Sequence, residues 1–229
     1  MLIIVKEPAA NGSYPPLQPW AGQTPPEGYY QIKDGLDTSV FAAHSGFVIL
    51  TVIRGIVTAM DPNTEAWNAA QAAQLPALIE AAVQQANATC DSLIYAGVDV
   101  KLADGSTEHF ALTLKDQTNI DSMFDAVRWG ATRYPYHADS GYCMVYQAAD
   151  IQAIYVACKS FVTYQTSYCN YFKHWLRRAA SAAELAAIHY GDPLPEDLAA
   201  RMQEVLTVAQ EETQVVLARL QQVGEAAAT

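Results

Sequence analysis

The feature that most constrains the fold is a long apolar stripe in the second half of the chain. Between Ile151 and Trp175 the larger side chains recur at alternating steps of three and four residues. The members of this stripe are Ile151, Ile154, Cys158, Phe161, Gln165, Tyr168, Phe172 and Trp175. Such spacing places side chains on one face of a helix. The sequence therefore predicts about thirty helical residues from Ala148, with one face that other elements must cover.

A second stripe follows in the acidic C-terminal segment, where the residues step by four and three. Its members are Met202, Leu206, Ala209, Thr213, Val216, Leu220 and Val223. A period of 3.5 residues is typical of a coiled coil, so this helix needs a partner in the same chain or in a neighbouring one. We expect the apolar members to form an oligomer interface, and a solvated terminal helix is the alternative. The residues of that candidate interface are Met202, Leu206, Ala209, Val216, Leu220 and Val223.

Alternating apolar residues predict β-hairpins. Val98, Val100 and Leu102 alternate before the Asp104-Gly105 turn, and apolar residues alternate again after it, from Phe110 to Leu114. The runs FVILTVI and IVTAM surround Arg54-Gly55 in the same way. Short turns that contain glycine between such runs are strong hairpin signals. The stretch YPYHADSGYCMVY, residues 134–146, predicts a further hairpin.

Punctuation by proline and glycine divides the chain into three zones. Residues 1–62 are predicted to form a small β module in which proline-rich segments either lie against their own sheet or serve as ligands for aromatic grooves. Residues 63–192 are predicted to form an α+β domain of two β-hairpins packed with helices. Residues 193–229 are predicted to form an acidic helix, with a coiled coil as one interpretation. The expected fold class is α+β with long helices towards the C-terminus.

Helix signals refine this outline. Asn63 or Thr64 can cap a helix that continues to Ala96, with a kink or gap expected at Pro76 because proline lacks a backbone N–H. Ser181 and Gly191 predict the two limits of a short helix.

Composition limits the class of protein. The chain has 229 residues, of which 51% are hydrophobic and 16% charged, as expected for a globular protein. Its net charge of −11 argues against nucleic-acid binding, because phosphates are bound by clustered Lys and Arg. The longest apolar stretch is interrupted by Arg54 and Gly55, so no membrane insertion is expected. The four cysteines lack paired spacing, which favours a reduced, intracellular origin over a disulfide scaffold.

His137 and Cys143 are the pair that could carry chemistry. If Asp139, Ser140 and Gly141 form the hairpin loop, the two side chains lie on one face of the ribbon. They could form a thiolate nucleophile or supply two metal ligands, but Asp139 is a weak third ligand and zinc needs at least three. The competing interpretation is purely structural. We therefore predict no catalytic, metal or cofactor-binding residue, and no enzyme.

Two other groups are ambiguous. Tyrosines along the helix that begins near Ala148, together with Trp175, could form a sugar-binding platform or simply belong to the core. The segment KHWLRRAA, residues 173–180, is the only basic cluster, and cations in the last turn of a helix also complement its dipole.

Several segments together indicate a family. The stretches NGSYPPLQPW, TPPEGYYQIKDGLDTSVF, GFVILTV and DPNTEAWNA resemble the start of small virion proteins encoded in tail modules of phages and prophages of gut Firmicutes. The segments AGVDVKLADGSTEHFALTLKDQTNI, YPYHADSGYCMVYQAADIQAI and AAELAAIHYGDPLP are similar to an uncharacterised domain of phage tail and tail-fibre proteins. The resemblance covers about residues 1 to 195. The hairpin HADSGYC is one residue longer than the commoner HADG form.

The resemblance implies a setting rather than a reaction. We expect a structural protein of the bacteriophage virion, at the baseplate or tail fibre, made in the cytoplasm of the bacterial host. Its expected partners are other tail or fibre proteins and copies of itself, with a trimer favoured. The alternatives are an assembly chaperone for tail fibres and a host-attachment adhesin that binds cell-surface glycan.

Overall fold

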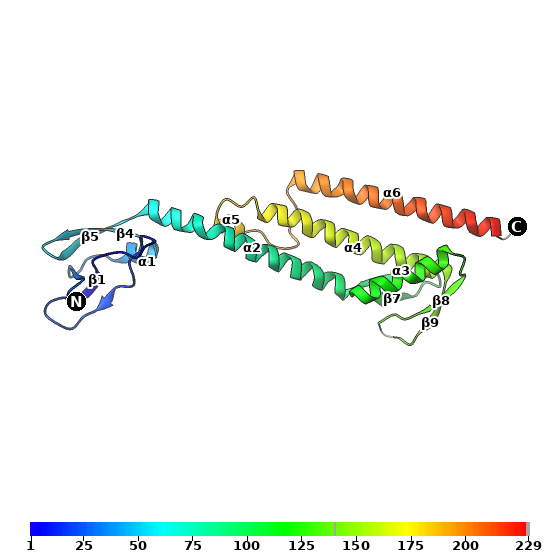
Figure 1. Ribbon diagram of the computed structural model, residues 1–229, viewed down its shortest axis with the longest axis horizontal. Coiled ribbons are helices and arrows are strands. Elements are labelled where there is room, and N and C mark those ends of the chain that lie inside the picture. Colours follow the sequence, from blue (N-terminus) through cyan, green and yellow to red (C-terminus); the bar gives the residue numbers. More distant parts are fainter. Residues whose placement is uncertain (140, 228–229) are drawn as a thin grey trace. The chain divides into compact units, whose positions relative to one another are not determined.

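The computed structural model describes residues 1–139 and 141–227, and for Gln221 and residues 223–227 it describes the backbone alone. The fold class is α+β, as predicted. Contacts divide the chain into two compact units, Met1–Leu78 and Ile79–Thr229 (Figure 1). This division falls inside a helix, later than the boundary expected at residue 62. The C-terminal helix belongs to the second unit.

The first unit is built on a five-stranded sheet. Its strands are β1 (Leu2–Val5), β2 (Gln18–Pro19), β3 (Tyr29–Ile32), β4 (Val48–Ile53) and β5 (Ile56–Pro62). Their order is β2-β1-β3-β5-β4, and all pairs are antiparallel except the parallel pair β3-β5. One face carries a small buried core of Ile4, Ile32, Val57 and Met60, to which the short helix α1 (Ser39–Ala43) contributes Val40 and Phe41.

The predicted hairpin around Arg54-Gly55 is confirmed. Ile53 pairs with Ile56, so the turn has two residues, and both have positive φ, at 50° and 78°. Two residues in this conformation form the turn that matches the twist of paired strands.

The proline-rich segment lies against its own sheet. Gln18 and Pro19 pair with β1, and Tyr14 and Leu17 pack against the core. The backbone N–H of Tyr14 donates to the carbonyl of Gly46 at 2.9 Å. The structure therefore agrees with the first interpretation of these prolines, in which the segment lies against its own sheet.

Helix α2 (Thr64–Ala96) contains Pro76, where a kink or a gap was expected. Asn63 caps the helix, since its side-chain oxygen accepts from the N–H of Ala66 at 3.2 Å. The helix then continues through Pro76 without the expected gap. A proline costs an interior helix about 3 kcal/mol, and burial of Val83 and Ile94 further along offsets this cost.

The second unit contains two hairpins and the remaining helices. The hairpins are β6 (Val98–Lys101) with β7 (Thr107–Phe110), and β8 (Arg133–Tyr136) with β9 (Met144–Gln147). The helices are α3 (Leu114–Arg128), α4 (Ala148–Leu176), α5 (Ala182–Ala186) and α6 (Glu196–Ala227). Both predicted hairpins and the long helix from Ala148 are confirmed. Helix α5 is shorter than predicted, because the chain turns after Ala187 and reaches Gly191 outside the helix.

Helix α4 is the centre of the second unit. It lies between the end of α2 and α6, and α3 packs beside it (Figure 1). Ile151 and Ile154 are fully buried, and Phe110 of β7 packs between Tyr136 and Tyr146 of the other hairpin, with ring centroids 6.3 and 6.1 Å apart. The first half of the predicted stripe, from Ile151 to Phe161, thus lies in the main core.

Candidate functional site

The C-terminal stripe finds its partner within the chain. Met202 is buried, and Leu206, Ala209, Val216 and Leu220 are half-buried on the side of α6 that packs against α4. The side chain of Val223, the last member of the predicted interface, lies outside the described residues. The facing helix that a 3.5-residue period requires is therefore α4 of the same chain, one of the two kinds of partner expected, and self-association through these positions stays a prediction.

An open groove of about 410 Å³ remains between α4 and α6. Ala209 and Thr213 are the small side chains on its α6 side, and Lys159 and Tyr164 line it from α4. The ammonium group of Lys159 lies 2.8 Å from the carboxylate of Asp121 in α3, so its charge is already paired. The groove arises because Ala209 and Thr213 are too small to fill the space between α6 and α4.

The opposite side of α6 is apolar in part and open to solvent. Val208 and Val215 are exposed there, 58% in the case of Val208. Glu204, Glu211 and Glu212 lie on the same helix and are exposed. This outer side of α6 mixes β-branched apolar groups with acidic groups.

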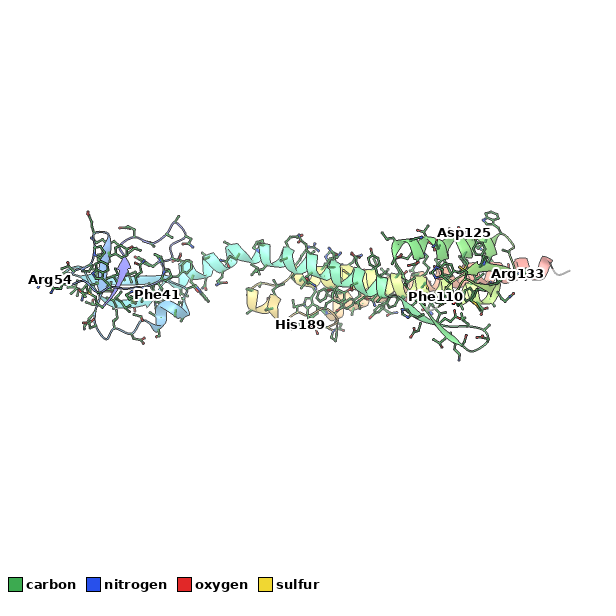
Figure 2. All side chains as sticks on the ribbon, turned by 90° about the horizontal axis from the view of Figure 1, so that it is seen from below. Phe41, Arg54, Phe110, Asp125, Arg133 and His189 are labelled. Atoms are coloured by element: carbon green, nitrogen blue, oxygen red, sulfur yellow. The ribbon has the colours of Figure 1, made fainter. Side chains whose placement is uncertain are left out.

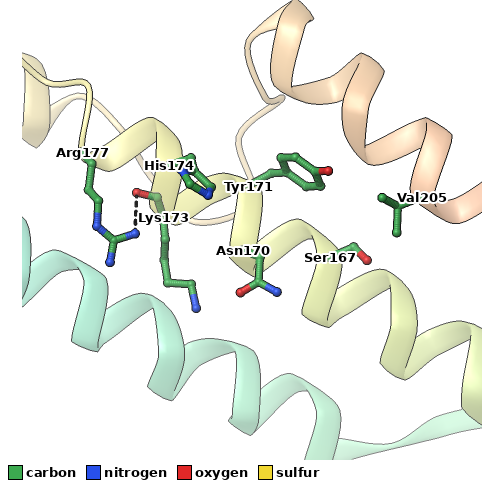
Figure 3. A pocket seen from close by; sticks show the side chains of 7 residues that line it. All are labelled: Ser167, Asn170, Tyr171, Lys173, His174, Arg177 and Val205. Atoms are coloured by element: carbon green, nitrogen blue, oxygen red, sulfur yellow. Dashed lines mark hydrogen bonds between the residues drawn. The ribbon is translucent and has the colours of Figure 1, made fainter.

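A basic groove of about 490 Å³ lies at the C-terminal end of α4 (Figure 3). Lys173, His174 and Arg177 line it together with polar groups from the same helix and Val205 from α6. The polar members are Ser167, Asn170 and Tyr171. The ammonium group of Lys173 donates to the side-chain oxygen of Asn87 at 2.9 Å. Within the described part of the chain, none of Lys173, His174 and Arg177 forms an ion pair.

Arg178, the next cation of the same segment, has a different role. Arg178 forms a two-pronged ion pair with Asp197 at 2.7 and 3.0 Å, which ties the end of α4 to the start of α6. This hydrogen-bonded contact lowers the pKa of Asp197. The basic cluster seen in the sequence thus divides into a structural ion pair and a groove with free charges.

His137 and Cys143 lie across from each other but do not form a site. Strands β8 and β9 pair Tyr136 with Met144, the register that places His137 across from Cys143 just beyond the ladder. Both side chains are exposed. The His137 ring instead stacks on Tyr136, with centroids 5.1 Å apart. Ser140, in the predicted loop, lies outside the described residues. The arrangement gives neither an activated thiolate nor a third metal ligand.

A different histidine is held tightly, which the sequence interpretation missed. His109 in β7 lies directly opposite Asp99 in β6, and its Nδ1 is 2.7 Å from that carboxylate. Its Nε2 lies 2.7 Å from the carbonyl oxygen of Ala96 and 3.6 Å from Asp139. The hydrogen bond to Asp99 is the main cause that raises the pKa of His109. The signal was available, because the register around Asp104-Gly105 pairs residue 99 with residue 109.

The aromatic side chains of α4 do not form one platform. Tyr155 stacks on Phe124 of α3 with centroids 3.6 Å apart, and Tyr168 is buried and donates to the carbonyl of Asp192. Tyr164 is exposed. Most of this set therefore belongs to the core.

Residues 1–139 and 141–227 hold no group of three His, Cys, Asp or Glu side chains placed to share a metal ion. None of the helices described is long and apolar enough to cross a membrane. Comparisons with protein-family models, curated proteins and solved structures found no match to this chain.

Proposed function

We propose that this chain is a structural component of a bacteriophage or phage-like tail, at the baseplate or tail fibre, and that it acts through protein-protein interfaces. The observation that carries the proposal is the amount of large apolar surface left open in both units. Apolar side chains that are exposed together on one element mark surfaces that partners cover, whereas single exposed ones do not. The main ones are Ile49, Ile53, Leu114, Trp129, Tyr142, Met144, Val145, Val208 and Val215.

The resemblance of residues 1–195 to tail proteins supplies the setting for these surfaces. The charge distribution supports it as well. The chain carries a net charge of −11, and residues 181–229 hold eight acidic and two basic side chains, a net charge of −6. A large net charge makes the subunits repel one another, which keeps a subunit with exposed apolar side chains soluble before it is assembled.

The test is quantitative mass spectrometry of particles purified from a lysogen that encodes this chain. We expect its peptides in a fixed ratio to the major tail protein through successive density gradients. An abundant host cytoplasmic protein is the matched control for carry-over. Presence in the lysate but loss from the particles would replace the structural role with that of an assembly chaperone.

A second candidate, a host-surface adhesin for anionic glycan, is favoured by the basic groove. Lys173 and Arg177 offer positive charge without an ion-pair partner among the described residues, and His174 and Tyr171 line the same groove. Purified protein would then bind isolated host cell walls, and Lys173→Glu with Arg177→Glu would abolish that binding. Arg133→Glu, an exposed change in β8, is the control. Equal binding by all three proteins, or by none, would remove this candidate.

A further inference from the structure

Strand β4 is an open edge of the five-stranded sheet. It pairs with β5 on one side, and on its other side no strand lies among the described residues. Its sequence, VILTVI, contains no charge, proline or glycine. Natural edge strands are usually protected by such residues or by a bulge. The bulge in this hairpin places the extra residue, Thr58, on β5, so β4 itself stays regular.

The free hydrogen-bonding groups of this edge can be assigned. Successive residues of a strand direct their N–H and C=O groups to opposite sides. Phe47 faces the β5 side, since its carbonyl accepts from Asn63 N–H at 2.9 Å, and so Ile49, Thr51 and Ile53 face β5 as well. The N–H and C=O groups of Leu50 and Val52 therefore point to the open edge.

The exposed side chains of β4 follow the same alternation. Ile49 and Ile53 are 55% and 57% exposed, with exposed Thr51 between them on one face of the sheet. Leu50 and Val52 pack against the core on the other face. Two large isoleucines thus stand symmetrically on either side of a central threonine.

We propose that a second copy of this chain pairs with this edge, β4 against β4 and antiparallel, about a two-fold axis at Thr51. In this register Leu50 lies opposite Val52 of the second copy, and the four N–H and C=O groups of Leu50 and Val52 in each copy are hydrogen-bonded. Ile49 lies opposite Ile53 of the second copy, so the exposed isoleucines cover each other. The contact is isologous, and it joins the two sheets into one.

Charge favours this partner over a contact through α6. Two copies with a net charge of −11 repel each other, but β4 brings no charged side chain to the axis. Arg54 lies at the tip of the hairpin (Figure 2). In the proposed dimer it would lie at the same end of the contact as Asp61 of the second copy, whose charge is opposite in sign. The outer side of α6 would instead oppose Glu204, Glu211 and Glu212 to themselves.

The contact between the two strands is small. Two six-residue strands bury less than the roughly 1,200 Å² of a standard interface, so we expect a weak dimer with a dissociation constant on the order of micromolar. This two-fold contact differs from the trimer through α6 that the sequence favoured. The pairing also stands independently of any role in a tail.

Charge variants test the pairing with the full-length chain by sedimentation across a wide concentration range. We expect wild type to dimerise with concentration, while Thr51→Lys and Thr51→Glu alone remain monomers. An equal mixture of the two variants should dimerise again, which shows that neither change damaged the fold. A monomeric wild type at every concentration, or dimers of Thr51→Lys equal to those of wild type, would overturn the proposal and leave the edge to a strand of another protein.

Cysteine variants test the register, in a Cys143→Ser background because Cys143 is exposed. Oxidised glutathione accepts the two electrons and two protons as two thiols form one disulfide. Thr51→Cys should cross-link to itself, since the Cβ atoms of an opposed pair lie about 4.5–5.5 Å apart. Ile53→Cys is the matched control, because its copies would stand roughly 14 Å apart. It should cross-link only when mixed with Ile49→Cys, and self-cross-linking of Ile53→Cys as fast as Thr51→Cys would overturn the register.

Discussion

Cys90 in α2 and Cys169 in α4 face each other across antiparallel helices, and each thiol donates to a carbonyl of the opposite helix. Cys90 Sγ lies 3.5 Å from the oxygen of Gln165, and Cys169 Sγ lies 3.6 Å from that of Ala86. Each acceptor is four residues before the facing cysteine, so the contact is locally two-fold symmetric. The Tyr190 ring packs beside both thiols. The thiols serve as small, satisfied groups where two helices meet.

The first prediction concerns thiol reactivity. Burial raises the pKa of Cys169 to about 11 and that of Cys158 to about 12. Because a raised pKa keeps the thiol protonated, neither group offers a reactive thiolate at pH 8. A thiol reagent applied to the folded protein should therefore label exposed Cys143 alone, as read by peptide mass spectrometry, and all four cysteines in urea. Labelling of Cys158 in the folded state at the rate of Cys143 would contradict this.

The second prediction is a pH dependence of stability from His109. Only the protonated ring can donate to both Asp99 and the carbonyl of Ala96, and its folded pKa is raised above 6.5. The stabilisation is therefore complete below pH 6.5 and disappears as pH rises through the folded pKa. Since the ring is 44% exposed, solvent limits the effect to about 0.5–1 kcal/mol. Urea unfolding of His109→Gln should show this loss at pH 5.5 and little loss at pH 9. Exposed His137→Gln is the control, and an equal loss for both variants would remove the assignment.

The third prediction separates backbone strain from a steric clash at glycine. Gly97 and Gly105 both have positive φ, at 87° and 90°. A side chain in that conformation costs about 1–2 kcal/mol. A Cβ at Gly97 would also stand 2.1 Å from the carbonyl oxygen of Phe110, whereas one at Gly105 meets nothing within 4 Å. Gly97→Ala should therefore lower the free energy of unfolding clearly more than Gly105→Ala, and equal losses would show that the close approach is absent.

The fourth prediction concerns the α6 stripe. Met202→Ala should reduce the free energy of unfolding by about 2–4 kcal/mol, because it empties a buried position between α6 and α4. Val208→Ala, on the exposed side of α6, should change it by less than about 0.5 kcal/mol. Neither variant should alter the sedimentation of the chain. If Met202→Ala instead left stability intact and weakened self-association, the stripe would be the oligomer interface after all.

Local sequence determined the elements of this protein. The steps of three and four from Ile151 to Trp175 specify a helix with one buried face, and the alternation around Asp104-Gly105 and Arg54-Gly55 specifies hairpins. Each signal is contained within a few residues of the element it predicts, because backbone geometry alone sets these periods. The register of the β6-β7 hairpin even implied the contact between Asp99 and His109.

Tertiary structure decided what covers each face. A 3.5-residue period states that α6 needs a facing helix, but its identity as α4 depends on how the chain between Leu176 and Glu196 returns. The basic groove combines α4 with Val205 of α6, and the open side of β4 follows from the order of the strands. Pro76 also stays within α2, since burial of residues further along outweighs a local cost. Periodicity identifies the face that a segment must bury, whereas contacts between distant segments determine which faces remain for partners.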